Sequence, residues 1–179
     1  MKTSHFLLVC ALAVAGAGAA RAFDPVKGPS SVEVTYFEKE KFTDVKDGWS
    51  GTDRGRDDTL ATLKEYITQR ATKNLSAGQK LAITITDVDL AGDFEPWRGS
   101  QWMDVRVVKD IYPPRINIMF RLTDSEGKIL KEEKRELIDT SFLMSLGTAA
   151  FRDDPLRHEK QMLSDWINNE FKVEKPKKS

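Results

Sequence analysis

Four carboxylates lie close together in the stretch TDVDLAGDFEPWRG, residues 86–99: Asp87, Asp89, Asp93 and Glu95. Clustered carboxylates can act as an acid–base pair or bind calcium, which takes about six to eight oxygen ligands from a tightly turned loop. Here Asp87 and Asp89 alternate with apolar residues, as on the solvated face of a strand, and no distal Glu follows at the spacing of a calcium loop. We therefore expect a strand with a polar outer face, no metal and no other cofactor, and keep the four carboxylates as weak metal candidates.

His158, in RDDPLRHEK, is a candidate general base. Catalysis by histidine needs a nucleophile and an orienting acid, but Asp153 and Asp154 are better explained as caps of a helix. Neither a Gly-x-Ser-x-Gly elbow nor a histidine pair for zinc is present. We expect His158 on the surface of the first helical turn. The alternative is a carboxylate-dependent hydrolase that joins His158 to one of three aspartates, Asp87, Asp89 or Asp93.

Aromatic side chains and an arginine gather in a stretch otherwise made of turn residues, at Phe94, Trp97, Arg98, Trp102 and, further along, Tyr112. Trp and Arg dominate recognition surfaces, and the two prolines after Tyr112 stiffen the backbone. Two interpretations stay open. Either the aromatics fold back as a lid over a sheet, or the 92–114 loop binds a partner, an envelope protein or an extended ligand.

The stretch GTDRGRD, residues 51–57, places Arg54 and Arg56 near the start of an expected helix. Such arginines could form an anion cradle at the positive end of the helix. The glycine and lysine spacing of a phosphate loop is absent, so we favour a helix lead-in.

The first 22 residues have the pattern of a Sec signal peptide. Lys2 precedes the apolar run FLLVCALAVAGAGAA, and the small residues of ARA predict cleavage after Ala22. A lipoprotein signal at Cys10 does not fit, because Val9 stands where a small residue is needed and most of the apolar run follows the cysteine. We expect a periplasmic or secreted protein without a membrane anchor.

Cleavage would leave 157 of the 179 residues, enough for a single domain with its own core. The removed segment carries Lys2 and Arg21, so 26 of the 28 basic residues and all 28 acidic residues remain. This balance indicates neither nucleic acid nor an anionic membrane as the partner. The one cysteine leaves with the signal, which excludes a disulfide, a thiolate nucleophile and a thiolate metal ligand.

Periodicity predicts the elements. A mobile leader is expected at 23–31. SVEVTYF then alternates between apolar and polar residues, which predicts a strand. Apolar residues at helical spacing follow from Leu60 to Leu75 and predict a helix, with Asp57 or Asp58 as its N-cap and a stop at Gly78. In KLAITITDVDLAG the apolar positions slip by one after Ile85, which predicts a β-bulge near Thr86 and Asp87.

The second half of the chain predicts a hairpin and a helix. Apolar and polar residues alternate in RINIMFRLTD, which predicts a strand, and DSEGK predicts the turn of a hairpin. The second strand of the hairpin, ILKEEKRELID, is charged on both faces, which is typical of an edge strand. MDVRVVKDI alternates weakly and is a candidate additional strand. Asp153 or Asp154, then Pro155, opens a helix bearing Leu156, Leu163, Trp166, Ile167 and Phe171, before a basic disordered tail at 173–179.

These elements predict one α+β domain at 32–172, in the order β-α-β-(β)-β-β-α. A mostly antiparallel, twisted sheet of four to five strands would carry two helices packed on one face.

Long stretches of the chain resemble a family of small secreted bacterial proteins, the domain-of-unknown-function 3016 family. The resemblance rests on VEVTYFEKEKFTDV, GTDRGRD, DVDLAGDFEPWRG, DVRVVKDIYPPRI and DPLRHEKQMLSDW. It implies no activity and no catalytic residues. We expect a non-enzymatic binding or envelope accessory protein; besides the hydrolase, the alternative is a structural or stress-related soluble protein without a discrete ligand.

Overall fold

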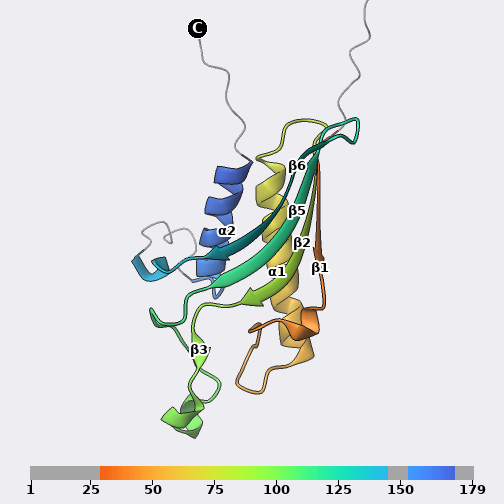
Figure 1. Cartoon of the computed structure of the whole chain (residues 1–179). Helices are drawn as coiled ribbons and strands as arrows, with labels where there is room; N and C mark the ends of the chain where they lie inside the picture. The colour runs from red at the N-terminus through yellow and green to blue at the C-terminus, as the bar shows by residue number, and fades with distance from the viewer. Residues whose placement is uncertain (1–28, 145–152, 172–179) are drawn as a thin grey trace, which may run out of the picture.

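The computed structural model describes residues 29–144 and 153–171 (Figure 1). The expected signal peptide at 1–22, most of the leader at 23–31 and the tail at 173–179 lie outside these residues. Within the described ranges, no helix is long and apolar enough to cross a membrane.

A four-stranded sheet forms the centre of the domain, in the order β1 (Ser31–Tyr36), β2 (Lys80–Asp89), β5 (Arg115–Thr123) and β6 (Ile129–Ile138). β1 is parallel to β2, and the other two neighbouring pairs are antiparallel. A parallel pair needs a long crossover, which α1 (Asp53–Thr72) provides. The highly charged β6 lies at an edge of the sheet, as its sequence predicts.

The predicted bulge in β2 is confirmed. Ile85 pairs with Ile118 and Asp87 pairs with Asn117, which leaves Thr86 as the extra residue. The slip returns Val88 and Leu90 to the buried face, where they are 0% and 5% exposed. Burial of one face therefore determines the register on both sides of the bulge.

Both helices, α1 and α2 (Arg157–Glu170), pack on one face of the sheet, which confirms the predicted α+β fold (Figure 1). Their apolar stripes meet the inward residues of the strands. The fully buried side chains of this core include Leu63, Ile67, Ile83, Ile118 and Leu163.

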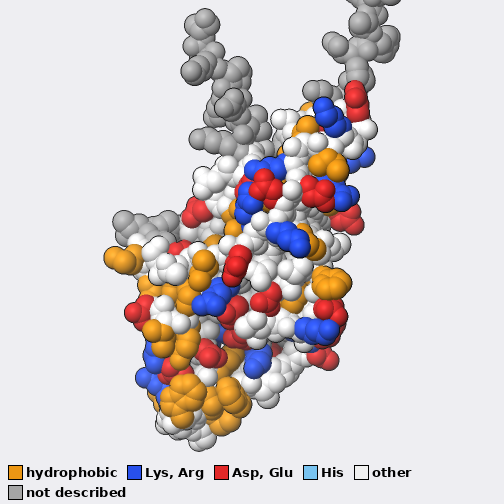
Figure 2. Space-filling model, in the orientation of Figure 1, with side chains coloured by type: hydrophobic (Ala, Val, Ile, Leu, Met, Phe, Trp, Pro, Cys, Tyr) orange, Lys and Arg blue, Asp and Glu red, His pale blue; other side chains and the backbone are white. Residues whose placement is uncertain are grey.

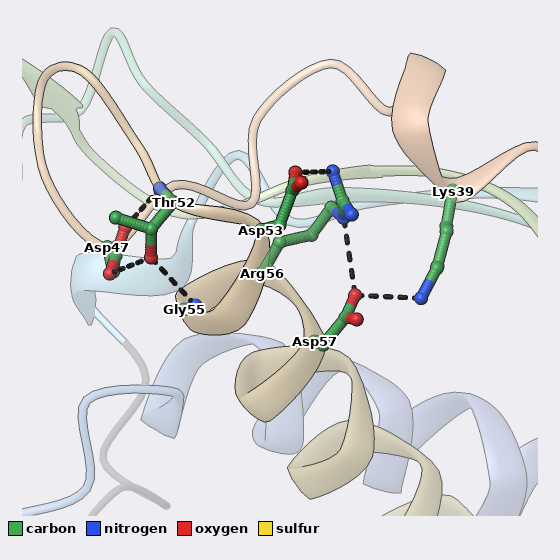
Figure 3. Close-up of polar contacts among 7 residues, drawn as sticks. All are labelled: Lys39, Asp47, Thr52, Asp53, Gly55, Arg56 and Asp57. Atoms are coloured by element: carbon green, nitrogen blue, oxygen red, sulfur yellow. Dashed lines mark hydrogen bonds and ion pairs between the residues drawn. The ribbon is translucent and has the colours of Figure 1, made fainter.

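The predicted starts of both helices were wrong. α1 is capped by Thr52, not by Asp57 or Asp58, because the Thr52 hydroxyl accepts from the Gly55 N–H at 2.9 Å and is itself held by Asp47 (Figure 3). α1 also ends at Thr72, before Gly78. α2 begins at Arg157, two residues after Pro155, and its N-cap residue Leu156 supplies no side-chain cap. Asp154 acts one turn earlier, where its carboxylate accepts the Leu156 N–H at 2.8 Å.

GTDRGRD spans the entry into α1: Gly51 and Thr52 lead into the helix, as predicted, and residues 53–57 already belong to it. Arg56 pairs with Asp53 at 2.9 Å and with Asp57 at 3.3 Å, and Asp57 in turn pairs with Lys39 at 2.8 Å (Figure 3). The guanidinium of Arg56 is thus already neutralised by carboxylates of the chain, which argues against an anion cradle.

A second, two-stranded sheet extends beyond the end of the main one (Figure 1). It joins β3 (Asp93–Phe94) to β4 (Arg106–Val107), so two residues of the weakly alternating MDVRVVKDI do pair, although not with the main sheet. Between them lie two 3-10 turns, Pro96–Arg98 and Ser100–Trp102. We call residues 93–107 the hairpin and residues 96–102 its tip.

Candidate functional site

The tip exposes two tryptophans. Trp97 is 71% exposed and Trp102 is 46% exposed, and hydrophobic side chains gather at this end of the molecule in Figure 2. Phe94, which we expected on the same recognition surface, is buried at 3% because the Arg106 guanidinium covers its ring, 4.5 Å from the centroid. Of Phe94, Trp97 and Trp102, only the two tryptophans of the tip are therefore exposed, and neither is buried as a lid over the sheet.

Glu95 holds the base of the tip. Its side chain is 2% exposed and accepts hydrogen bonds from the Lys109 ammonium and, at 3.2 Å, from the Tyr112 hydroxyl. Arg98 forms an ion pair with its other oxygen at 3.1 Å. The hydrogen bond from Lys109 is the main cause that lowers the pKa of Glu95. Glu95, Arg98 and Tyr112 thus brace the tip from within, and the carboxylate is already occupied by cations of the chain.

Arg106 fastens the hairpin to the body of the domain, a role that the sequence did not indicate. Its guanidinium binds both carboxylate oxygens of Asp44, at 2.8 and 3.2 Å. It also donates to the carbonyl of Gly92 at 2.9 Å and to that of Lys46 at 3.0 Å. Asp44 is itself bound to the end of β2 by backbone hydrogen bonds with Val88 and Leu90. Arg106 therefore pins the hairpin to the main sheet through Asp44, and the Asp104 carboxylate of the hairpin adds a contact by accepting the Trp49 N–H at 3.1 Å.

A cleft of about 870 Å³ lies between the hairpin, the end of β2, α1 and the start of α2. Apolar residues line its inner part: Leu90, Ala91, Phe94 and Leu156. Exposed residues of α1 and of the loops, such as Asp58, Thr62 and Asp104, line its mouth. Four stretches of the chain, 46–47, 58–62, 90–106 and 153–160, thus meet around one mixed apolar and acidic space.

Glu159 of α2 lines this cleft and is only 1% exposed. Its Oε1 accepts the Ala91 N–H at 2.6 Å, whereas Oε2 has no hydrogen-bond partner among the described residues. Burial is the main cause that raises the pKa of this carboxyl, against the N–H of Ala91, which lowers it. The sequence contained a signal for this position, because Glu159 lies three residues after Leu156 and four before Leu163 on the apolar stripe of the helix.

The aspartates of the acidic stretch lie in separate local environments and do not form one site. Asp87 accepts the N–H and the hydroxyl of Thr43, both at 2.8 Å, and Asp93 accepts the N–H of Phe94 at 2.7 Å. Asp89 is partly buried, which raises the pKa of its carboxyl, and nearby Asp44 raises it further. Among the described residues, no group of three His, Cys, Asp or Glu side chains is placed to hold a metal ion.

His158 is not on the surface, contrary to our expectation. It is 6% exposed because its ring packs edge to face on Phe142, with 4.8 Å between the ring centroids. This burial lowers the pKa of the imidazole. The Nε2 atom accepts from Arg157 at 3.0 Å, and no hydrogen bond connects the ring to Asp87, Asp89 or Asp93 within the described ranges. The residues of the hydrolase alternative are therefore not assembled into one hydrogen-bonded group.

Comparison with known proteins identifies the family. A family model described as "Protein of unknown function (DUF3016)" matches residues 30–169, which include the whole main sheet, the hairpin and nearly all of α2. No curated protein and no solved structure matches the chain.

Proposed function

We propose a function for this chain, which belongs to the DUF3016 family of proteins of unknown function: it is a non-enzymatic binding protein of the bacterial envelope that contacts a partner protein through the tip. The observation that carries the proposal is the exposure of Trp97 and Trp102 on two consecutive tight turns. The localisation in this proposal rests on the signal-peptide pattern of residues 1–22.

The tip is supported in a way that favours recognition. A buried carboxylate, Glu95, and the guanidinium of Arg106 fix its base, so little conformational freedom remains to be lost when a partner binds. Tryptophan combines a large apolar surface with few rotatable bonds, and Trp and Arg are the residue types most enriched among energetically dominant contacts. A braced surface of this composition fits a protein partner.

Charge favours a protein over a membrane as the partner. Residues 92–112 carry four acidic side chains, Asp93, Glu95, Asp104 and Asp110, against three basic ones, Arg98, Arg106 and Lys109. Segments that bind anionic lipid surfaces carry an excess of Lys and Arg instead. Two of these cations, Arg98 and Lys109, are also already paired with Glu95.

The test places a photo-crosslinking amino acid, p-benzoylphenylalanine, at position 97 in the protein expressed with its own leader. We expect one discrete crosslinked protein from position 97. The same amino acid at Phe37, which is 57% exposed and outside the hairpin, is the matched control and should give no such product. The product should also disappear when Trp102→Ala is added, with the melting temperature unchanged.

Two outcomes would contradict the proposal. Equal crosslinking from positions 37 and 97 would show a non-specific encounter. Sedimentation of the wild-type protein, but not of Trp97→Ala, with vesicles of phosphatidylethanolamine and phosphatidylglycerol would assign the tip to a membrane surface.

A further inference from the structure

The cleft between the hairpin, α1 and α2 has an excess of negative charge. Six carboxylates line it, those of Asp47, Asp58, Asp104, Asp153, Asp154 and Glu159. Of these carboxylates, Asp58 is paired with Arg54 at 3.8 Å and Asp154 with Lys160. Only three cations line the cleft, and two of them form ion pairs: Lys160 with Asp154, and Arg106 with Asp44, which is not a lining residue. The third, Lys46, lies at the exposed mouth, with its ammonium 5.8 Å from the centre of the Trp49 ring.

The inner end of the cleft contains an incomplete polar contact. Glu159 Oε2 is buried and has no hydrogen-bond partner among the described residues, and no ion pair joins Glu159 to a cation of these residues. A buried acceptor without a partner costs folding free energy that an apolar side chain would not. A ligand that donates a hydrogen bond to Oε2 would remove this cost.

The ligand chemistry follows from what surrounds that oxygen. The carboxylates do not converge on one point as metal ligands do, and the described residues hold no group suited to a metal ion. Leu90, Phe94 and Leu156 instead offer an apolar wall beside Glu159. An apolar stem with a positively charged, hydrogen-bond-donating end matches both features, since the stem can lie along the wall while the charge is paired.

We propose that this cleft is a binding site for an organic cation, an alkylammonium or guanidinium group whose charged end donates to Glu159 Oε2. The stem lies against the apolar wall, and the acidic mouth attracts the ligand. The site is separate from the tip, because neither Trp97 nor Trp102 lines it. The two proposals can therefore fail independently.

The test is isothermal titration calorimetry of the mature protein with three probes of equal length: pentylamine, pentanol and pentanoate. Pentylamine should bind saturably and at least about tenfold more tightly than pentanol, the difference expected of one charge-assisted hydrogen bond. Pentanoate should not bind, because the cleft repels anions. Nα-acetyl-lysine methylamide carries the same ammonium on a peptide, so tighter binding of this probe than of pentylamine would identify a polypeptide side chain as the source.

The variants separate the buried carboxylate from a general charge effect. Glu159→Gln keeps an acceptor for Ala91 and should weaken pentylamine binding by about tenfold or more, while leaving pentanol unaffected. Asp165→Asn removes the same charge from an exposed position of α2 outside the cleft and should change nothing. Thr62→Trp, at the mouth, should block pentylamine without involving Glu159, which keeps the test valid if the glutamine variant folds poorly.

Three results would overturn the inference. Equal affinity of pentanol and pentylamine would make the cleft a purely apolar site. Unchanged pentylamine binding in both Glu159→Gln and Thr62→Trp would place the cation elsewhere. Binding of calcium chloride in place of pentylamine, with the affinity lost in Glu159→Gln, would make the cleft a metal site.

Discussion

Removal of the Arg106 side chain should loosen the hairpin and lower the stability of the whole domain. The guanidinium makes four hydrogen bonds, two of them to the Asp44 carboxylate, and both side chains are largely shielded, at 20% and 13% exposure. Arg106→Ala leaves that carboxylate and two carbonyl groups without their partner. Breaking a buried pair in this way costs about 3–5 kcal/mol. Since this pair is partly solvated, we expect about 2–4 kcal/mol of lost unfolding free energy.

The measurement is urea unfolding followed by tryptophan fluorescence, in a double-mutant cycle with Asp44→Ala. A loss of about 3 kcal/mol corresponds to a fall of about 10 °C in the melting temperature of a domain of this size. The two single variants should not be additive, because the double variant removes both charges together. Arg106→Lys should recover only part of the loss, since an ammonium cannot bind both carboxylate oxygens in a fixed fork.

Two results would refute this reasoning. A cost of Arg106→Ala below about 0.5 kcal/mol, as for an ordinary surface substitution, would show that the pair does not fasten the hairpin. Strict additivity of the two single variants would show that Asp44 and Arg106 act independently. A loosened hairpin should also reduce crosslinking from position 97, which links the stability measurement to the proposed function.

Two further predictions concern carboxylates. Burial raises the pKa of Glu159 above its value in the unfolded chain. As the pH rises, the unfolded chain therefore loses this proton before the folded protein does. The free energy of unfolding should fall as the pH rises from the ordinary carboxyl range to the raised pKa. The positive charge of Arg106 opposes this rise in the pKa, and the negative charge of Asp154 adds to it. In Glu159→Gln the urea midpoint should lose this part of its pH dependence. Identical plots of urea midpoint against pH for the two proteins would show that Glu159 is not the group responsible. Asp87→Ala should cost about 1 kcal/mol, because the bulge loses its two bonds to Thr43. Asp87→Asn, which keeps an acceptor for the Thr43 N–H, should cost less in the same urea titration.

Local patterns in the sequence were sufficient to predict the elements and their layers. The slip of the apolar positions after Ile85 predicted the bulge of β2, because a strand with one buried face cannot lose its two-residue period without an extra residue. The charge on both faces of residues 129–138 likewise predicted an edge strand. Both signals come from residues within one strand and need no knowledge of distant partners.

The exact starts of the helices depended on contacts that local patterns leave ambiguous. Several residues ahead of α1 could serve as its cap, and the hydrogen bonds of Asp47 to Thr52 select one of them. His158 was expected on the surface, because the sequence does not show that Phe142 packs against its ring. In both places, competing conformations of similar local energy are decided by a tertiary contact.

The sequence by itself determined an α+β domain with an aromatic, turn-rich segment between its second and third long strands. Only the tertiary structure decided what that segment does: it buries Phe94, exposes Trp97 and forms one wall of the acidic cleft. The contacts responsible join residues far apart, 62 positions from Asp44 to Arg106 and 68 from Ala91 to Glu159. A hydrogen bond between such residues leaves no periodic trace in the sequence, because its partners meet only after the sheet and both helices have packed.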